Sequence, residues 1–277
     1  MSDKKKMSKK KKITILYAML GVCIAAFLVF AGWLGYELYK DWQSQQYYTT
    51  LSAGIEIRPR SPGYSRSPDS TEPSAPGGEY AHLEPDFDPG WLPYLDFDAL
   101  NERFPGVIGW IKLEGTAIDY PIMQTDNNWY FLGHLPDGTR HRSGSVFLDF
   151  RNSPDFSDKN SLLYGHESRT QDMFGALKNY RRQEYYDANP VMHIYTPTGD
   201  YELVLIAGYL VDSGVEQPRI NFSDDDSFRN YINDIRRRSF FRADVDVSLG
   251  DRIVSLCTCA YDYTNARLII VGKLVDF

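Results

Sequence analysis

Two cysteines near the end of the chain have the spacing of a possible reactive thiol site. Cys257 and Cys259 are two residues apart in the run VSLCTC, which is typical of a β-strand, so their side chains share one face. Cys259 comes last, where the strand gives way to the polar segment AYDYTN, and a thiol there is accessible to a substrate. Arg267 opens the next strand-like run, so antiparallel pairing brings its guanidinium back toward Cys259. One interpretation is a nucleophilic thiol beside a cation; the other is a buried structural cysteine and a solvated arginine.

A distant histidine is the candidate partner for such a thiol. His166 ends the apolar run SLLYG, at the end of another expected strand. Its separation from Cys259 along the chain decides nothing, because catalytic partners meet in the folded protein. Taken alone, a histidine at a strand end is more often structural than catalytic.

The other histidines and acidic residues lack the spacing of a metal site. His134 and His141 flank the turn-rich stretch LGHLPDGTRH, but no acid or cysteine lies near them at ligand spacing. His193 falls in a strand-like run and His82 in a spacer. The acidic run 223–226 is explained by a helix N-terminus, where carboxylates are favourable. We therefore expect neither a metal nor a cofactor.

Eight strand-like runs predict the framework that positions these residues. Each run is bounded by turn residues, and several alternate polar and apolar side chains. The runs are 107–114, 117–124, 144–150, 160–166, 191–197, 201–212, 251–259 and 266–276. Thr198–Asp200 reads as a hairpin turn. The sequence predicts a mainly β fold with added helices: a closed eight-stranded β-barrel with a long helix inserted before the last two strands.

Few helices interrupt these runs. The clearest covers residues 227–241, where an apolar face forms at helical spacing and acids come early and arginines late. A short helix is expected at 97–104 with Asp96 as its N-cap, and another at 172–180.

The N-terminus predicts a membrane anchor. Residues 13–35 contain no charged side chain and are long enough to cross a hydrocarbon core of about 30 Å. The segment 1–12 holds seven lysines, which should stay cytoplasmic and leave the rest of the chain outside. A cleaved signal peptide is the alternative, but its apolar region should be shorter and no small-residue cleavage site closes this one. Cys23 is then an ordinary residue of the membrane helix.

A spacer and an acidic ectodomain follow the anchor. Residues 36–92 include a stretch rich in Pro, Ser and Gly that cannot bury enough apolar surface to order itself. The expected catalytic domain covers 93–277. Beyond residue 12 the chain carries 23 basic and 36 acidic residues, a net charge of −13. This balance argues against nucleic acid as a partner, because phosphate binding needs a basic surface.

Several motifs together resemble those of the class B sortases. The segment NSLLYGHESRTQDMFGALKNY is similar to the sortase histidine motif, and VSLCTCAYDYTNARLIIVGKLV resembles the cysteine strand with its following arginine. Further similar segments are VIGWIKLEGTAIDYPIMQ and GSVFLDFRN, and the long helix ending RRRSFF points to class B. The resemblance covers residues 96–277 in the right order.

This resemblance implies roles for the candidate residues. Cys259 would be the nucleophile, His166 the acid and base, and Arg267 the stabiliser of the oxyanion. The enzyme would cleave an exported protein after the threonine of an NPxTN-like or TG-ending sorting motif, through a thioester. The acceptor would be an amine of a peptidoglycan precursor or of a pilin. The alternatives are a cysteine endopeptidase that releases its product to water and an inactive ectodomain that binds wall proteins.

The chain departs from the family pattern at two positions. Cys257 stands where members usually carry Ser, and it either packs as a small core residue or traps an oxidised Cys259 in a strained disulfide. Glu167 stands where Asn is common, which leaves the three candidate residues intact. Substrate recognition is expected to involve the insert 212–242 and the loop after Cys259.

Overall fold

The computed structural model describes residues 9–54, 95–168, 171–216, 218–260 and 262–276. It divides into two compact units, residues 1–47 and 48–277, which are described separately here.

The first unit is formed by one long helix, whose last residues belong to the second unit. Helix α1 (Lys9–Ala53) is continuous, so it extends well beyond the expected membrane span of 13–35 into the predicted spacer. The stretch that begins at Leu16 is long and apolar enough to cross a membrane. The Pro-rich part of the spacer, with His82, lies outside the described residues. The domain boundaries stay a prediction.

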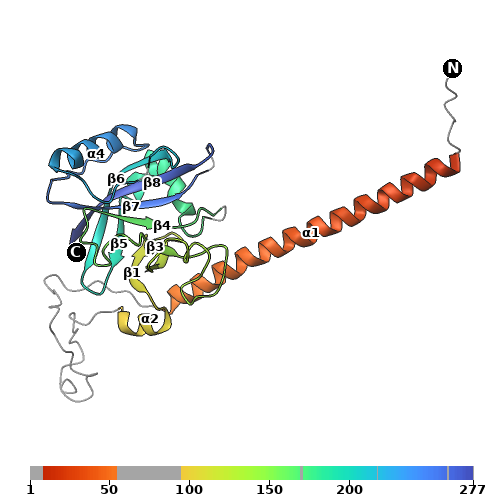
Figure 1. The fold of residues 1–277 in the computed structure, drawn as a ribbon, viewed down its shortest axis with the longest axis horizontal. Helices are drawn as coiled ribbons and strands as arrows, with labels where there is room; N and C mark the ends of the chain where they lie inside the picture. The colour runs from red at the N-terminus through yellow and green to blue at the C-terminus, as the bar shows by residue number, and fades with distance from the viewer. Residues whose placement is uncertain (1–8, 55–94, 169–170, 217, 261, 277) are drawn as a thin grey trace, which may run out of the picture. The chain divides into compact units, whose positions relative to one another are not determined.

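The second unit is built on a closed barrel of eight strands, which confirms the predicted fold class (Figure 1). Neighbours around the barrel follow the order β1-β2-β3-β4-β7-β8-β6-β5. All eight predicted strands are present. They are β1 (Val107–Lys112), β2 (Asp119–Met123), β3 (Val146–Leu148), β4 (Asn160–Tyr164), β5 (Val191–Tyr195), β6 (Asp200–Asp212), β7 (Arg252–Cys259) and β8 (Ala266–Asp276).

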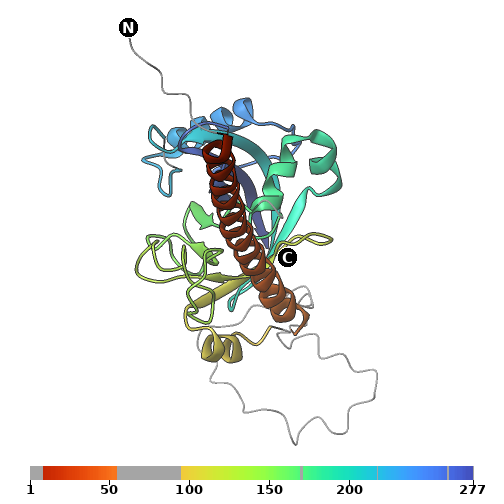
Figure 2. The ribbon, with the colours of Figure 1, turned by 90° about the vertical axis from the view of Figure 1, so that its right-hand side faces the viewer.

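Short helices surround the barrel. Helix α2 (Phe97–Arg103) begins after Asp96, whose carboxylate accepts a hydrogen bond from the Ala99 N–H at 2.9 Å, as predicted. The helix expected at 172–180 is a 3₁₀ helix, η1 (Gly175–Arg181), and it is followed by α3 (Gln183–Ala188), a helix that was not predicted. In two perpendicular views, α2 and the inserted helix α4 lie on opposite sides of the barrel (Figures 1 and 2).

Helix α4 (Asp225–Arg238) covers part of the outer barrel face. Asp224 caps it by accepting a hydrogen bond from the Ser227 N–H at 2.7 Å, so the acidic run lies at a helix N-terminus as predicted. Its buried face packs against outward-facing residues of β6, β7 and β8. The predicted apolar face is confirmed, and its buried residues are Phe228, Tyr231, Ile232 and Ile235.

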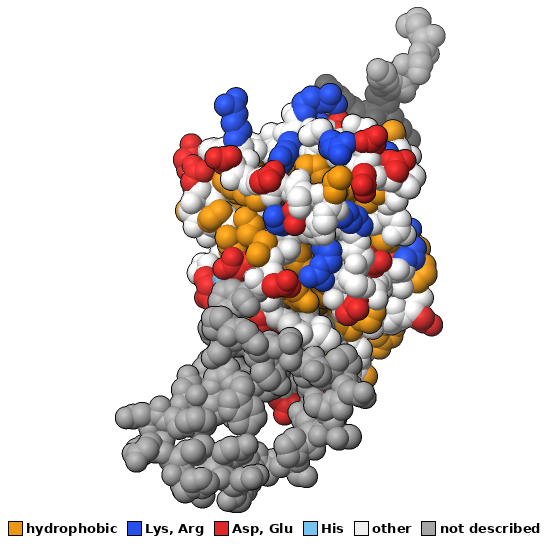
Figure 3. Space-filling view, turned by 90° about the vertical axis from the view of Figure 1, so that its left-hand side faces the viewer, with side chains coloured by type: hydrophobic (Ala, Val, Ile, Leu, Met, Phe, Trp, Pro, Cys, Tyr) orange, Lys and Arg blue, Asp and Glu red, His pale blue; other side chains and the backbone are white. Residues whose placement is uncertain are grey.

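The barrel interior is filled by the opposite faces of the same strands. Leu163, Leu256 and Ile270 are register neighbours on β4, β7 and β8, and all three are fully buried. Because side chains alternate along a strand, the residues that follow them in sequence point outward. The described part of the surface in Figure 3 mixes Lys and Arg with Asp and Glu, with hydrophobic side chains between them.

Candidate active site

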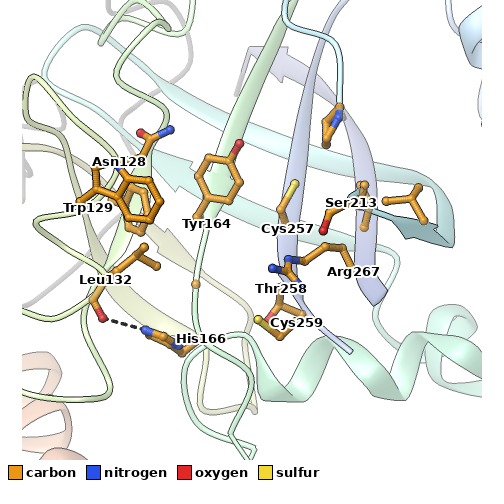
Figure 4. A pocket seen from close by; sticks show the side chains of 15 residues that line it. Asn128, Trp129, Leu132, Tyr164, His166, Ser213, Cys257, Thr258, Cys259 and Arg267 are labelled. Carbon is orange, nitrogen blue, oxygen red and sulfur yellow. Dashed lines mark hydrogen bonds between the residues drawn. The ribbon is translucent and has the colours of Figure 1, made fainter. Parts of the chain in front are cut away.

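A pocket opens on the outer barrel face next to the part that α4 covers. It has a volume of about 340 Å³ and is bordered by the ends of β4 and β7, the start of β8 and the loop between β2 and β3. Three of its lining residues are the predicted His166, Cys259 and Arg267 (Figure 4). The pocket thus brings together side chains that are separated by as many as 101 positions in the sequence.

The pairing of β7 with β8 places Arg267 beside Cys259. The two strands are antiparallel, and Cys259 is the direct register partner of Arg267. Residues paired in this way have Cβ atoms about 5 Å apart and point to the same face. Cys259 is half-buried at the strand end, which leaves its thiol accessible from the pocket. The antiparallel return predicted from the sequence is confirmed.

The pairing of β4 with β7 brings the end of β4, and with it His166, to the pocket that Cys259 lines. These strands are parallel, Tyr164 pairs with Cys257, and the Gly165 N–H donates to the Cys257 carbonyl at 3.2 Å. His166 is two residues beyond Tyr164, as Cys259 is two residues beyond Cys257. In Figure 4 the imidazole, which follows β4, and the thiol at the end of β7 line the same pocket, and the dashed line joins the imidazole to Leu132.

The glycine before His166 is required by close packing. A Cβ on Gly165 would lie 2.7 Å from ring atoms of Phe174, so a larger residue would displace this ring. The Phe174 N–H donates to the His166 carbonyl at 3.0 Å, which ties the histidine backbone to the start of η1. The Gly-His and Met-Phe-Gly parts of the sequence motif therefore form one packed unit.

The contact of His166 with Leu132 fixes the protonation of one ring nitrogen. The Nε2 atom lies 2.8 Å from the Leu132 carbonyl oxygen. A carbonyl only accepts hydrogen bonds, so Nε2 carries the hydrogen in this contact. The Nδ1 atom is then the nitrogen left to exchange a proton in the pocket.

Cys257 has surroundings different from those of Cys259. It is buried in the cluster under α4, with Tyr231 and Ile235 among its other members. Burial raises the pKa of the Cys257 thiol to about 12; the charge of Asp149 adds to this rise, and that of Arg267 opposes it. The geometry fits the interpretation of Cys257 as a small packing residue.

Several lining residues were not predicted from the sequence. Asn128, Trp129 and Leu132 come from the loop between β2 and β3, and Tyr164 comes from β4. Trp129 is 81% exposed, and an exposed tryptophan in the polar-aromatic run NNWYFL is the signal that could have indicated a binding loop. The expected insert 212–242 contributes Ser213 and Pro218. The role of the loop after Cys259 stays a prediction.

The histidines outside the pocket have local partners. His134 Nδ1 lies 2.7 Å from the Tyr130 carbonyl oxygen, and the two rings stack. His141 Nδ1 accepts a hydrogen bond from the Ser143 N–H, and the His193 ring stacks on Tyr195. Within the described ranges, no three His, Cys, Asp or Glu side chains gather where they could hold a metal ion.

The chain is similar to two curated proteins over its barrel domain. It is 32% identical over 181 residues to Sortase B of Staphylococcus aureus, an alignment that covers 65% of this chain and 74% of the relative. It is 34% identical over 182 residues to Sortase B of Listeria monocytogenes, which covers 65% and 73%. No family model matches the chain.

Solved structures show the same similarity in three dimensions. The Staphylococcus aureus sortase B–substrate complex superimposes with a TM-score of 0.62 at 31% identity, covering 65% of this chain and 84% of that one. A sortase B complexed with triglycine has the same TM-score and identity and covers 65% and 85%. A Bacillus anthracis protein described as similar to sortase B has a TM-score of 0.66 at 25% identity and covers 86% and 97%.

Proposed function

Because this chain belongs to the class B sortases, a family of cysteine transpeptidases, we propose that Cys259 is its nucleophile, His166 its general acid and base, and Arg267 its oxyanion donor. The observation that carries the proposal is the strand register. Antiparallel pairing with β8 puts a guanidinium beside the Cys259 thiol, and the segment after β4 brings the His166 imidazole to the same pocket.

In the first half of the reaction, the Cys259 sulfur attacks the carbonyl carbon of the threonine at the scissile bond, and the thiol proton passes to His166 Nδ1. Negative charge develops on the carbonyl oxygen, where the Arg267 guanidinium offers N–H donors. The C–N bond then breaks, and His166 gives the proton on Nδ1 to the departing amine. The threonine carbonyl remains bound to Cys259 as a thioester.

In the second half, an amine enters the space left by the departing peptide. His166 Nδ1 takes a proton from this amine as its nitrogen attacks the thioester carbonyl. The C–S bond breaks, the sulfur takes the proton back from His166 Nδ1, and the threonine is joined to the acceptor by a new amide bond. Water in place of the amine gives hydrolysis.

The substrate and acceptor classes follow from the relatives. One relative is recorded as a substrate complex and another as a complex with triglycine, which support a sorting-signal peptide and an amine acceptor for this chain. We expect an exported protein with an NPxTN-like or TG-ending motif, and an amine of a peptidoglycan precursor or of a pilin.

Helix α1 supports a location at the cell membrane. Its uncharged stretch is long enough to cross a bilayer, and the lysines that precede it favour the cytoplasmic side for the N-terminus. The barrel domain then lies outside the cell, where sorting-signal proteins are exported.

Product analysis tests this function. The full-length chain in detergent is incubated with quenched fluorescent peptides containing NPQTN or NPQTG, with and without triglycine. We expect a product whose mass equals the threonine-ending fragment joined to triglycine, and no product from Cys259→Ala. If triglycine leaves only the free acid, the chain is an endopeptidase; if neither peptide is cleaved, the transpeptidase proposal for these motifs fails.

A further inference from the structure

Asp149 is a fully buried carboxylate beside the pocket, and the proposed reaction does not use it. It follows β3, and its side chain has no exposed surface. The Arg151 guanidinium donates to it from Nε at 2.8 Å and from Nη2 at 2.9 Å. A buried charge is retained only when it is paired and hydrogen-bonded, so this carboxylate needs its donors.

Two further donors to Asp149 come from the wall of the pocket. Asn128 Nδ2 donates to Asp149 Oδ2 at 3.0 Å, and the Tyr164 hydroxyl donates to the same oxygen at 3.1 Å. Asn128 is also held from its other side, because its Oδ1 accepts the Phe150 N–H at 3.0 Å. One carboxylate oxygen therefore joins the loop between β2 and β3 to the end of β4.

Both of these segments adjoin the His166 side chain, whose backbone is also held by the Phe174 N–H. His166 follows Tyr164 by two residues, and its partner Leu132 follows Asn128 by four. The 2.8 Å contact between His166 Nε2 and the Leu132 carbonyl closes the connection. If the loop moves away from β4, this carbonyl leaves the imidazole, and the Nε2 hydrogen loses its acceptor.

We propose that Asp149 is a positioning residue of the enzyme: it clamps the Asn128–Leu132 loop to the end of β4 and thereby fixes the tautomer and orientation of His166. Residues that hydrogen-bond to the groups around a catalytic side chain determine how accurately that side chain is held. The effect on kcat/KM rests on the proposed function, whereas the effect on the His166 tautomer does not depend on it.

A matched aspartate elsewhere in the chain separates positioning from stability. Asp251 precedes β7 at the end away from Cys259, and it also has an ion pair and a backbone donor. Its Oδ2 lies 2.9 Å from Lys273 Nζ and accepts the Ser248 N–H at 2.7 Å. Asp251→Asn removes a similar set of interactions without touching the pocket.

The first test reads the imidazole directly. The full-length chain, labelled with ¹⁵N-histidine in detergent, is compared with Asp149→Asn and Asp251→Asn, and the His166 signals are assigned with His166→Gln. We expect the Nε2–H tautomer to dominate in the parent chain and in Asp251→Asn. In Asp149→Asn we expect both tautomers. An unchanged His166 spectrum in folded Asp149→Asn overturns the inference, whether or not any peptide is cleaved.

The second test is kinetic and uses whichever of the two quenched peptides the parent chain cleaves faster. Asp149→Asn should lower kcat/KM about tenfold to a hundredfold, and Tyr164→Phe should lower it less. The double variant should be no worse than Asp149→Asn alone, because the hydroxyl of Tyr164 then has no carboxylate to hold. Equal kcat/KM for Asp149→Asn and Asp251→Asn contradicts the clamp and leaves the transpeptidase proposal standing.

Discussion

The two thiols on β7 differ in what surrounds each sulfur. Cys259 ends the strand at the pocket, while Cys257 is 4% exposed and lies against the cluster under α4. Alkylation requires a thiolate, and burial, which raises the pKa of Cys257 to about 12, removes this form at neutral pH. The burial of Cys257 therefore fits a packing residue rather than a second nucleophile.

This difference predicts selective alkylation. With iodoacetamide at pH 8, burial keeps the Cys257 thiol protonated and covered, so the label should appear on Cys259 and not on Cys257. Peptide mass mapping after digestion gives the position of the label. In guanidinium chloride both residues should react. Labelling of Cys257 first in the folded chain would contradict the assignment.

At the scale of elements, one barrel face serves two purposes. The outward residues of β6, β7 and β8 pack under α4 along part of their length, and the same face then opens as the pocket. Cys257 belongs to both regions. The helix therefore contributes to the rigidity of the strands whose register places Cys259 beside Arg267.

Truncation of the α4 contact should lower stability. Ile235 is fully buried between α4 and the barrel, so Ile235→Ala should reduce the free energy of unfolding by about 3 kcal/mol. Urea unfolding followed by tryptophan fluorescence measures this change. On the same helix the Arg237 side chain is 79% exposed, and Arg237→Ala should change the free energy by less than about 0.5 kcal/mol. Equal effects of the two substitutions would show that α4 is not packed as described.

The strands were predictable because each is a local pattern. The alternation of polar and apolar side chains and the turn residues at each end located all eight strands. The loop between Cys259 and Arg267 is short enough to predict that β7 and β8 pair. Helix α3 was missed because Gln183–Ala188 is only six residues long and buries only Tyr186. The pocket wall was missed for a different reason. Asn128, Asp149 and Tyr164 meet through hydrogen bonds between three segments, and no local pattern encodes such a meeting.

At the scale of the whole molecule, the chain combines a helix suited to a bilayer with an enzyme domain. The lysine-rich N-terminus and the acidic remainder have opposite net charges. The proposed orientation rests on the lysines that precede the apolar stretch. The last residues of α1 belong to the barrel unit, where the Tyr48 hydroxyl donates to the Gly144 carbonyl at 2.6 Å.

Fractionation tests the anchor. In bacterial cells that express it, the full-length chain should sediment with membranes and require detergent for release, whereas a chain lacking residues 1–35 should stay soluble. Protease added to intact protoplasts should digest the barrel domain of the full-length chain. Release of a soluble form cleaved near residue 35 would indicate a signal peptide in place of an anchor.

The central claim is that Cys259 carries the acyl group between the two halves of the reaction. The most direct measurement is the mass of the full-length chain, quenched in acid shortly after mixing with the cleavable peptide in the absence of an amine. We predict a mass increase equal to the threonine-ending acyl fragment, mapped to Cys259 and removed by hydroxylamine. An acyl group mapped to Cys257, or one that persists in Cys259→Ala, would contradict the account.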